Sequence, residues 1–147
     1  MTTSAGAKPE VVIGVDPGGT FGLARVRTDA PEWVIEPGQV THPLAALDAI
    51  KRWHRDAQVM GLDCTVLIED FNTGGSITKD GAHTLKMCGF LYWSCVNLHI
   101  PVLWVQPQNR MIGLPKAKQL LPKNEDRHAA DALAHAIAFL QRKGRRR

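Results

Sequence analysis

Short apolar runs alternate with polar turns along the first half of the chain. The run EVVIGVD (Glu10–Asp16) is rich in β-branched residues and is followed by Pro17-Gly18-Gly19, which is typical of a strand buried on both faces that stops in a tight turn. Phe21–Arg27 and Trp33–Glu36 follow at spacings that suit antiparallel hairpins. This pattern predicts an opening meander of three strands.

The pattern then changes to helical spacing. Apolar residues recur every three or four positions from Pro43, a residue that suits a first helical turn, until Gly61. A second buried strand is expected at Cys64–Phe71 (CTVLIEDF), a largely apolar helix at Gly81–Leu98, and a third short buried strand at Pro101–Gln106.

The last predicted element is another helix. A loop with Pro107 and Pro115 precedes it, and Asn124 is expected to cap it. Glu125-Asp126 would then lie in the first turn, near the positive end of the helix dipole. We expect this helix to run to about Gln141.

The elements together predict an α/β fold with a mixed five-stranded sheet flanked by helices. Their order is strand, strand, strand, helix, strand, helix, strand, helix (β-β-β-α-β-α-β-α). Right-handed crossovers place the first and fourth strands side by side and parallel. Ligand sites in such sheets lie beyond the carboxyl ends of parallel strands. Asp16 and Glu69 are expected to meet at that edge.

Length and charge indicate a single domain with a basic end. The chain has 147 residues, of which 44% are hydrophobic, and a net charge of +4. Five of its 18 basic residues lie in the last six positions, so residues 1–141 carry a net charge of −1. We expect a flexible segment at 1–9, one domain at 10–141 and a basic tail at 142–147.

The cysteine count and the apolar segments favour a reducing compartment. The three cysteines contain no CxxC pair, which argues against a disulfide framework and against a thiolate zinc site. The N-terminus lacks an apolar leader, and no apolar stretch is long enough to cross a bilayer. We therefore expect a soluble cytoplasmic protein, with no membrane partner, in a bacterium or in the host of a virus.

Four residues have the chemistry of a metal site. A carboxylate at the end of a buried strand is costly unless it is paired or binds a cation. The last helix adds His128 and Asp131 on one face, among alanines that allow a close approach to the sheet. Oxygen ligands of this kind suit Mg²⁺ or Mn²⁺, and two such ions can clamp the attacking and leaving oxygens of a phosphodiester.

Each of these residues also has a structural interpretation. Asp16 could cap its turn, and Glu69 and Asp70 must point to opposite faces of their strand, so we expect Glu69 to face the cleft. His135, four residues after Asp131, either forms a His-Asp-His zinc site with His128 and Asp131 or, as the favoured interpretation, is a hydrogen-bonded or partly exposed histidine. The stripe of Leu85, Cys88, Tyr92 and Cys95 is either core or a subunit contact.

Three motifs carry a resemblance to a known family. VIGVDPGGTFGLARV at 12–26, VLIEDF at 66–71 and HAADALAHA at 128–136 resemble the RuvC-like Holliday junction resolvases of the ribonuclease-H-like superfamily, phage-type members included. The resemblance covers most of the chain and implies a ribonuclease-H-like fold. It also implies a homodimeric, Mg²⁺-dependent endonuclease that nicks two strands of a four-way DNA junction symmetrically. Two-metal-ion hydrolysis would leave a 5′-phosphate and a 3′-hydroxyl.

The resemblance also assigns roles by motif. The implied catalytic and metal-binding set is Asp16, Glu69, His128 and Asp131. In relatives, an aromatic residue that stacks on an opened base pair follows the glutamate, and Phe71 lies close to that place. Arg110, Lys116 and Lys118 are counterparts of basic residues that the family carries between the last strand and the last helix.

Other functions remain open from the sequence. A less selective nuclease of this fold, acting on forks, flaps or RNA–DNA hybrids, would have the same metal site. Asp16-Pro17-Gly18-Gly19-Thr20 also resembles the phosphate turn of actin-like ATPases and sugar kinases, but 147 residues leave no room for their second domain. A binding module without catalysis is a third alternative, which the complete ligand set disfavours.

Overall fold

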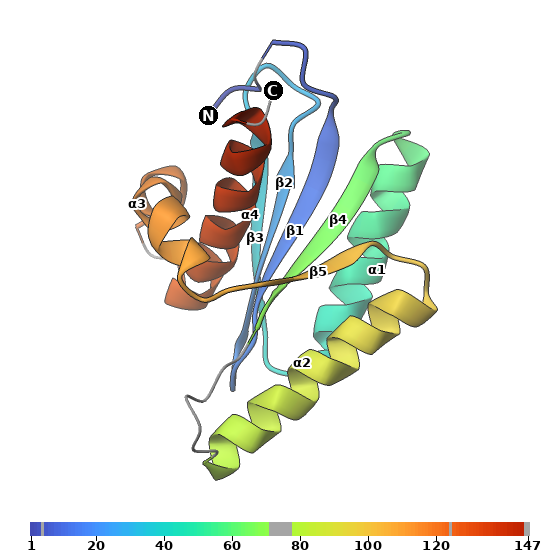
Figure 1. The fold of residues 1–147 in the computed structure, drawn as a ribbon, viewed down its shortest axis with the longest axis vertical. Helices are drawn as coiled ribbons and strands as arrows, with labels where there is room; N and C mark the ends of the chain where they lie inside the picture. The colour runs from blue at the N-terminus through green and yellow to red at the C-terminus, as the bar shows by residue number, and fades with distance from the viewer. Residues whose placement is uncertain (4, 71–77, 124, 146–147) are drawn as a thin grey trace.

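A five-stranded mixed sheet forms the centre of the molecule (Figure 1). The computed structural model describes residues 1–3, 5–70, 78–123 and 125–145. The strand order is β3-β2-β1-β4-β5, in which β2 pairs antiparallel with β1 and β3, and β1, β4 and β5 run parallel. The strands are β1 (Glu10–Asp16), β2 (Phe21–Arg27), β3 (Val34–Val40), β4 (Asp63–Glu69) and β5 (Val102–Val105).

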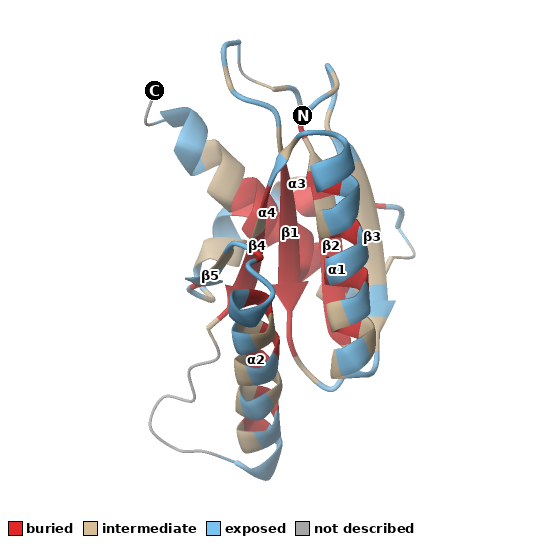
Figure 2. Cartoon of the chain, turned by 90° about the vertical axis from the view of Figure 1, so that its right-hand side faces the viewer, coloured by how far each residue is buried: buried red, intermediate tan, exposed pale blue. Residues whose placement is uncertain are grey.

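Helices cover both faces of this sheet. They are α1 (Pro43–Val59), α2 (Lys79–Asn97), α3 (Asn109–Leu120) and α4 (Arg127–Arg145). Alternate residues of β1 divide between two cores, as the period of a strand requires: Val11 and Ile13 pack with α1 and α2, and Val12 packs with α3 and α4. Figure 2 shows the buried residues concentrated on the central strands and on the inward sides of the helices. The predicted fold class is therefore confirmed.

Glycines let α4 lie directly on the sheet. A Cβ atom on Gly14 of β1 would lie 2.0 Å from the carbonyl oxygen of Ala132, and one on Gly22 of β2 would lie 2.0 Å from that of His128. Any larger residue at these positions would push the helix away, because the atoms that its Cβ would meet belong to the backbone of α4. The helix side of this contact is a run of small residues, as predicted, and Ala129 and Ala132 are fully buried.

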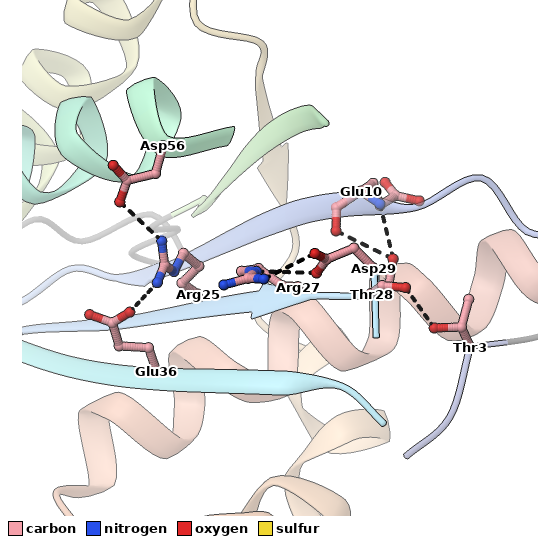
Figure 3. A network of polar contacts seen from close by, with 8 residues as sticks. All are labelled: Thr3, Glu10, Arg25, Arg27, Thr28, Asp29, Glu36 and Asp56. Atoms are coloured by element: carbon pink, nitrogen blue, oxygen red, sulfur yellow. Dashed lines mark hydrogen bonds and ion pairs between the residues drawn. The ribbon is translucent and has the colours of Figure 1, made fainter. Parts of the chain in front are cut away.

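On the other face, a partly buried arginine joins the sheet to α1 (Figure 3). Arg25 of β2 forms ion pairs with Glu36 of β3 and, at 3.3 Å, with Asp56 of α1. Its guanidinium carbon lies 5.7 Å from the ring centroid of Trp53, whose Nε1 donates to Glu36 at 3.3 Å. This network ties α1 to β2 and β3.

Two predictions about local structure are wrong. Most of the segment predicted as a loop, from Asn109 to Leu120, is the helix α3, and Pro115 lies inside it, whereas Pro107 precedes it. The helix persists because it packs on α4: Gly113 sits so close that a Cβ atom would lie 2.1 Å from the carbonyl oxygen of Ala134. The strand β5 is not buried either, since it is the last strand of the sheet and leaves Leu103 48% and Trp104 40% exposed.

Smaller differences concern the ends of elements. β3 continues to Val40, four residues beyond the predicted end, because it pairs with β2 along its whole length. The predicted cap Asn124 lies outside the described residues. Asp126 precedes the helix instead of lying in its first turn, and its Oδ1 accepts a hydrogen bond from the backbone N–H of His128 at 2.6 Å. The helix α4 continues past Gln141 to Arg145.

The helices were also compared with the length of a bilayer. Within the described ranges, no helix combines the length and the apolar character that a membrane crossing requires.

Candidate active site

Two carboxylates lie at the edge of the sheet where parallel strands end. β1 and β4 are in parallel register with Val15 beside Ile68, so the next residues, Asp16 and Glu69, leave the sheet side by side. Only 5% of Asp16 and 7% of Glu69 is exposed. The prediction that these two residues share one edge of the sheet agrees with this register.

The first two turns of α4 bring two more residues to this edge. Asp16 is paired in register with Gly22, and Gly22 is where the His128 carbonyl touches the sheet. His128 therefore lies over the end of β1, and its Nδ1 forms a 2.8 Å hydrogen bond with Oδ2 of Asp16. Asp131, one turn later, is 8% exposed. A glycine on a neighbouring strand thus positions the helix that completes the site.

An arginine lies between two of the carboxylates. Arg110, at the start of α3, places Nη1 3.6 Å from Oε2 of Glu69 and 3.6 Å from Oδ2 of Asp131. Its side chain is 37% exposed, whereas those of Glu69 and Asp131 are 9% and 12% exposed. A partly solvated cation therefore bridges two buried anions. Arg110 is one of the residues predicted from the sequence to bind DNA. The unexpected helix α3 brings it to this site.

The site is electrostatically unfavourable for Asp16. Burial raises the pKa of its carboxyl group to about 6, and the negative charges of Glu69 and Asp131 contribute to the rise. The hydrogen bond with His128 lowers the pKa of Asp16 but does not cancel the effect of burial. A cation placed among these carboxylates would remove the cost, since opposite charge favours the ionised form.

The donor atoms fit a hard divalent cation. Asp16, Glu69 and Asp131 supply carboxylate oxygens, the ligands that Mg²⁺ and Mn²⁺ prefer. In the present arrangement, no three His, Cys, Asp or Glu side chains among the described residues converge on one ion position. His128, His135 and Arg110 hold the carboxylates instead.

The other predicted DNA-binding residues have different positions. Phe71 lies outside the described residues. Lys116 and Lys118 follow Arg110 on α3, where Lys116 is half-buried and Lys118 is exposed. Lys118 also lines a cavity of about 520 Å³ together with Lys123 and Arg127. Basic side chains thus continue from the carboxylates along α3 to the start of α4.

One contact in the site was not expected from the sequence. His135 is 1% exposed, and its Nε2 lies 2.7 Å from Oε2 of Glu69. The helical spacing to Asp131 identified His135 as a candidate, but only in a zinc site with His128. The two histidines contact different carboxylates, because His128 pairs with Asp16.

The cysteines do not take part in this chemistry. Cys64, Cys88 and Cys95 are free and buried. Burial raises the pKa of the Cys64 and Cys88 thiols to about 12 and that of Cys95 to about 11. Protonated thiols are poor nucleophiles and metal ligands, in agreement with the interpretation from the sequence.

Comparison with known proteins identifies the fold. No protein-family model matches this sequence, and a search of curated proteins finds no match. Among solved structures, Thermus thermophilus RuvC in complex with a Holliday junction substrate superimposes with a TM-score of 0.64 at 19% identity, over 92% of this chain and 96% of that one. A second structure of Thermus thermophilus RuvC gives 0.62 at 20% identity, over 91% and 96%. The chain therefore has the ribonuclease-H-like fold of the RuvC Holliday junction resolvases.

Proposed function

We propose that this protein is a structure-specific DNA endonuclease that resolves four-way junctions by hydrolysis of phosphodiesters. The observation that carries the proposal is the group of three buried carboxylates and a histidine, Asp16, Glu69, Asp131 and His128, at the carboxyl edge of β1 and β4. One of the similar solved structures is a RuvC in complex with a Holliday junction substrate, and it shares this fold over nearly its full length.

Divalent cations are part of the proposal. Asp16, Glu69 and Asp131 would hold two Mg²⁺ ions, with Mn²⁺ as a substitute and His128 as a further ligand. When bound, such ions would polarise a phosphoryl oxygen and lower the pKa of a water molecule that they bind. The proposed products are a 5′-phosphate and a 3′-hydroxyl.

Arg110 has a different role in this reaction. Its guanidinium forms ion pairs with Glu69 and Asp131. Its partial exposure at the rim of the site also suits contact with a DNA phosphate, which guanidinium groups bind in a bidentate manner. We therefore propose that Arg110 stabilises negative charge on the phosphate that is cut.

Replacing Arg110 with alanine tests this role. We expect junction cleavage to fall by about 10²-fold, the usual cost of losing one charge-stabilising donor. Single-turnover cleavage at saturating Mg²⁺ measures the effect. Arg55→Ala, an exposed arginine on α1 across the sheet, is the control and should cut normally. Wild-type cleavage by the Arg110 variant would contradict the assignment.

An exposed aromatic surface supports a homodimer. Tyr92 of α2 stacks on Trp104 of β5 with ring centroids 4.6 Å apart, and its edge meets Trp93 at 5.4 Å. Trp93 is 62% exposed, Trp104 40% and the nearby Val96 39%. Aromatic residues are enriched in protein interfaces. We propose that this aromatic surface (Tyr92, Trp93, Val96 and Trp104) binds a second copy, which would supply the second active site that symmetric nicking requires.

The dimer proposal predicts the effect of a charge on this surface. Trp93→Glu should convert a dimer to a monomer by weakening association about 100-fold, because a carboxylate would be buried without a partner. Sedimentation equilibrium measures the mass. The control, Leu44→Glu on α1, replaces another exposed apolar residue (54%) and should remain dimeric. A monomeric wild-type protein at working concentrations would favour a less selective nuclease.

Cleavage of defined DNA structures tests the function itself. A labelled four-way junction, a linear duplex, a fork, a flap and an RNA–DNA hybrid of matched sequence are incubated with Mg²⁺, Mn²⁺ or EDTA. The proposal expects paired symmetric nicks in the junction that disappear in EDTA. Equal cutting of the other substrates would indicate the less selective nuclease, and no cutting of any substrate would indicate a binding module.

A further inference from the structure

A buried histidine makes one hydrogen bond, and that bond is to a carboxylate of the candidate active site. The side chain of His135 is 0% exposed, and its Nε2 lies 2.7 Å from Oε2 of Glu69. Its other ring nitrogen, Nδ1, is buried and has no hydrogen-bond partner among the described residues. The imidazole therefore satisfies one of its two polar atoms.

The direction of this hydrogen bond follows from the chemistry of the two groups. An ionised carboxylate oxygen only accepts hydrogen bonds. Nε2 of His135 must then carry the proton and donate to Oε2 of Glu69. In the neutral ring this leaves Nδ1 as an unprotonated acceptor, which matches its lack of a donor in the apolar surroundings of α4.

Packing alone does not explain a histidine at this position. Its neighbours along α4, Ala134, Ala136 and Ile137, are fully buried apolar residues. An aliphatic side chain of similar volume would fill the space without leaving a polar atom unpaired, and such a polar atom costs free energy when it is buried. The hydrogen bond to Glu69 is therefore the feature that distinguishes histidine from leucine here.

We propose that His135 is a positioning residue that fixes the carboxylate of Glu69 for binding of a divalent cation. This inference rests on the proposed metal-dependent nuclease function. The Nε2–H group holds Oε2 from the buried side, while Arg110 faces the same oxygen from the partly exposed side at 3.6 Å. Both contacts fix the rotation of the carboxylate, so Oε1 is the oxygen left for the ion. Outer partners that orient a ligand typically change metal affinity or activity by about 10–100-fold when they are removed.

Two substitutions separate positioning from packing. His135→Gln keeps a donor near the position of Nε2, whereas His135→Leu keeps the volume and removes the donor. We expect the leucine variant to bind Mn²⁺ about 10–100-fold more weakly, and the glutamine variant to recover most of the affinity. Both should bind a four-way junction normally in EDTA. His54→Leu on α1 is the control for a histidine outside the site.

Three readouts make the result decisive. Mn²⁺ binding to the free protein, measured by electron paramagnetic resonance, reports on Glu69 without any DNA. Thermal unfolding in EDTA reports packing, and cleavage against Mn²⁺ concentration reports function. Wild-type Mn²⁺ affinity in the folded leucine variant, or equal loss of affinity in both variants, would overturn the positioning role.

These measurements distinguish a failure of the His135 inference from a failure of the proposed nuclease function. If the wild-type protein binds Mn²⁺ but does not cut junctions, the substrate proposal is wrong and the Mn²⁺ affinities still decide the role of His135. If it binds no Mn²⁺, both proposals fall. If the leucine variant does not fold, ¹⁵N spectra of the wild-type histidine ring decide instead: a proton on Nε2 with a bare Nδ1 supports the inference, and the opposite tautomer overturns it.

Discussion

Replacing Asp16 with asparagine is expected to reduce junction cleavage by about 10³-fold or more while junction binding in EDTA stays unchanged. Asp16 is the last residue of β1 and one of the three buried carboxylates of the site, and its side chain is 7% exposed. Asparagine keeps the shape and can still hydrogen-bond to His128, but it brings no negative charge for a divalent cation. Single-turnover cleavage in Mg²⁺ and gel-shift binding in EDTA measure the two effects.

The same substitution should stabilise the metal-free protein in a pH-dependent way. The pKa of Asp16 is raised from 3.8 to about 6 in the folded state, so the folded protein binds the proton more tightly than the unfolded chain does. Well below pH 3.8 both states are protonated and the carboxyl group has no effect, whereas its cost develops as the pH rises from there toward 6 and is complete above that value. We expect Asp16→Asn to gain on the order of 2–3 kcal/mol at pH 7 and very little at about pH 3.

Urea unfolding in EDTA across this pH range measures the gain. Asp48→Asn, an exposed residue on α1, is the control and should change neither cleavage nor stability. Cleavage retained by the Asp16 variant would remove Asp16 from the catalytic set. Loss of stability at pH 7 would contradict the interpretation that the charges at this site oppose folding.

Gly22→Ala is expected to destabilise the fold by about 3 kcal/mol or more. The new methyl group would lie 2.0 Å from the carbonyl oxygen of His128 and 2.1 Å from its carbonyl carbon. Neither backbone atom can move unless α4 leaves the sheet, and that movement would separate His128 from Asp16. Cleavage should therefore fall by about 10²-fold even in conditions where the variant is folded. The urea midpoint and the rate of cleavage are the measurements.

Gly38→Ala is the matched control for this prediction. Gly38 lies in β3, which is next to β2, the strand that carries Gly22. It is paired in register with Leu23 of β2. A methyl group there would make ordinary contacts, the nearest at 3.5 Å with Cβ of Leu23. The free energy of unfolding of the Gly38→Ala variant should stay within about 1 kcal/mol of the wild-type value. It should exceed that value if the loss of glycine flexibility in the unfolded chain dominates. Equal effects of the two substitutions would show that the close approach of α4 is not what makes Gly22 necessary.

The elements with strong local patterns were predictable. β1 and β2 have their predicted bounds because each is a dense β-branched or apolar run that ends at a polar turn. α1 begins at Pro43 as expected and ends before Gly61, which has a φ of +68°. The right-handed crossover rule placed β1 beside β4 in parallel, and this was enough to bring Asp16 and Glu69 to one edge.

The helix α3 was not predictable from such patterns. It contains Pro115, which removes one hydrogen bond of the helix, and it buries only Gly113 and Ala117. Its stability comes from a close backbone contact with α4 across more than twenty residues of sequence. Local propensity contains no information about that contact, so the segment resembled a loop.

The sequence by itself determined the mixed five-stranded sheet and four candidate ligands, Asp16, Glu69, His128 and Asp131, because strand burial and helical spacing are periodic and local. Only the tertiary structure decided which groups hold those carboxylates. His135 reaches Glu69 over 66 residues of sequence and Arg110 bridges Glu69 and Asp131, and both contacts depend on how α3 and α4 pack on the sheet. The physical reason is that the charge and the orientation of a buried carboxylate are set by its neighbours in space. These neighbours come together only when the helices pack on the sheet, where α4 approaches Gly14 and Gly22 closely.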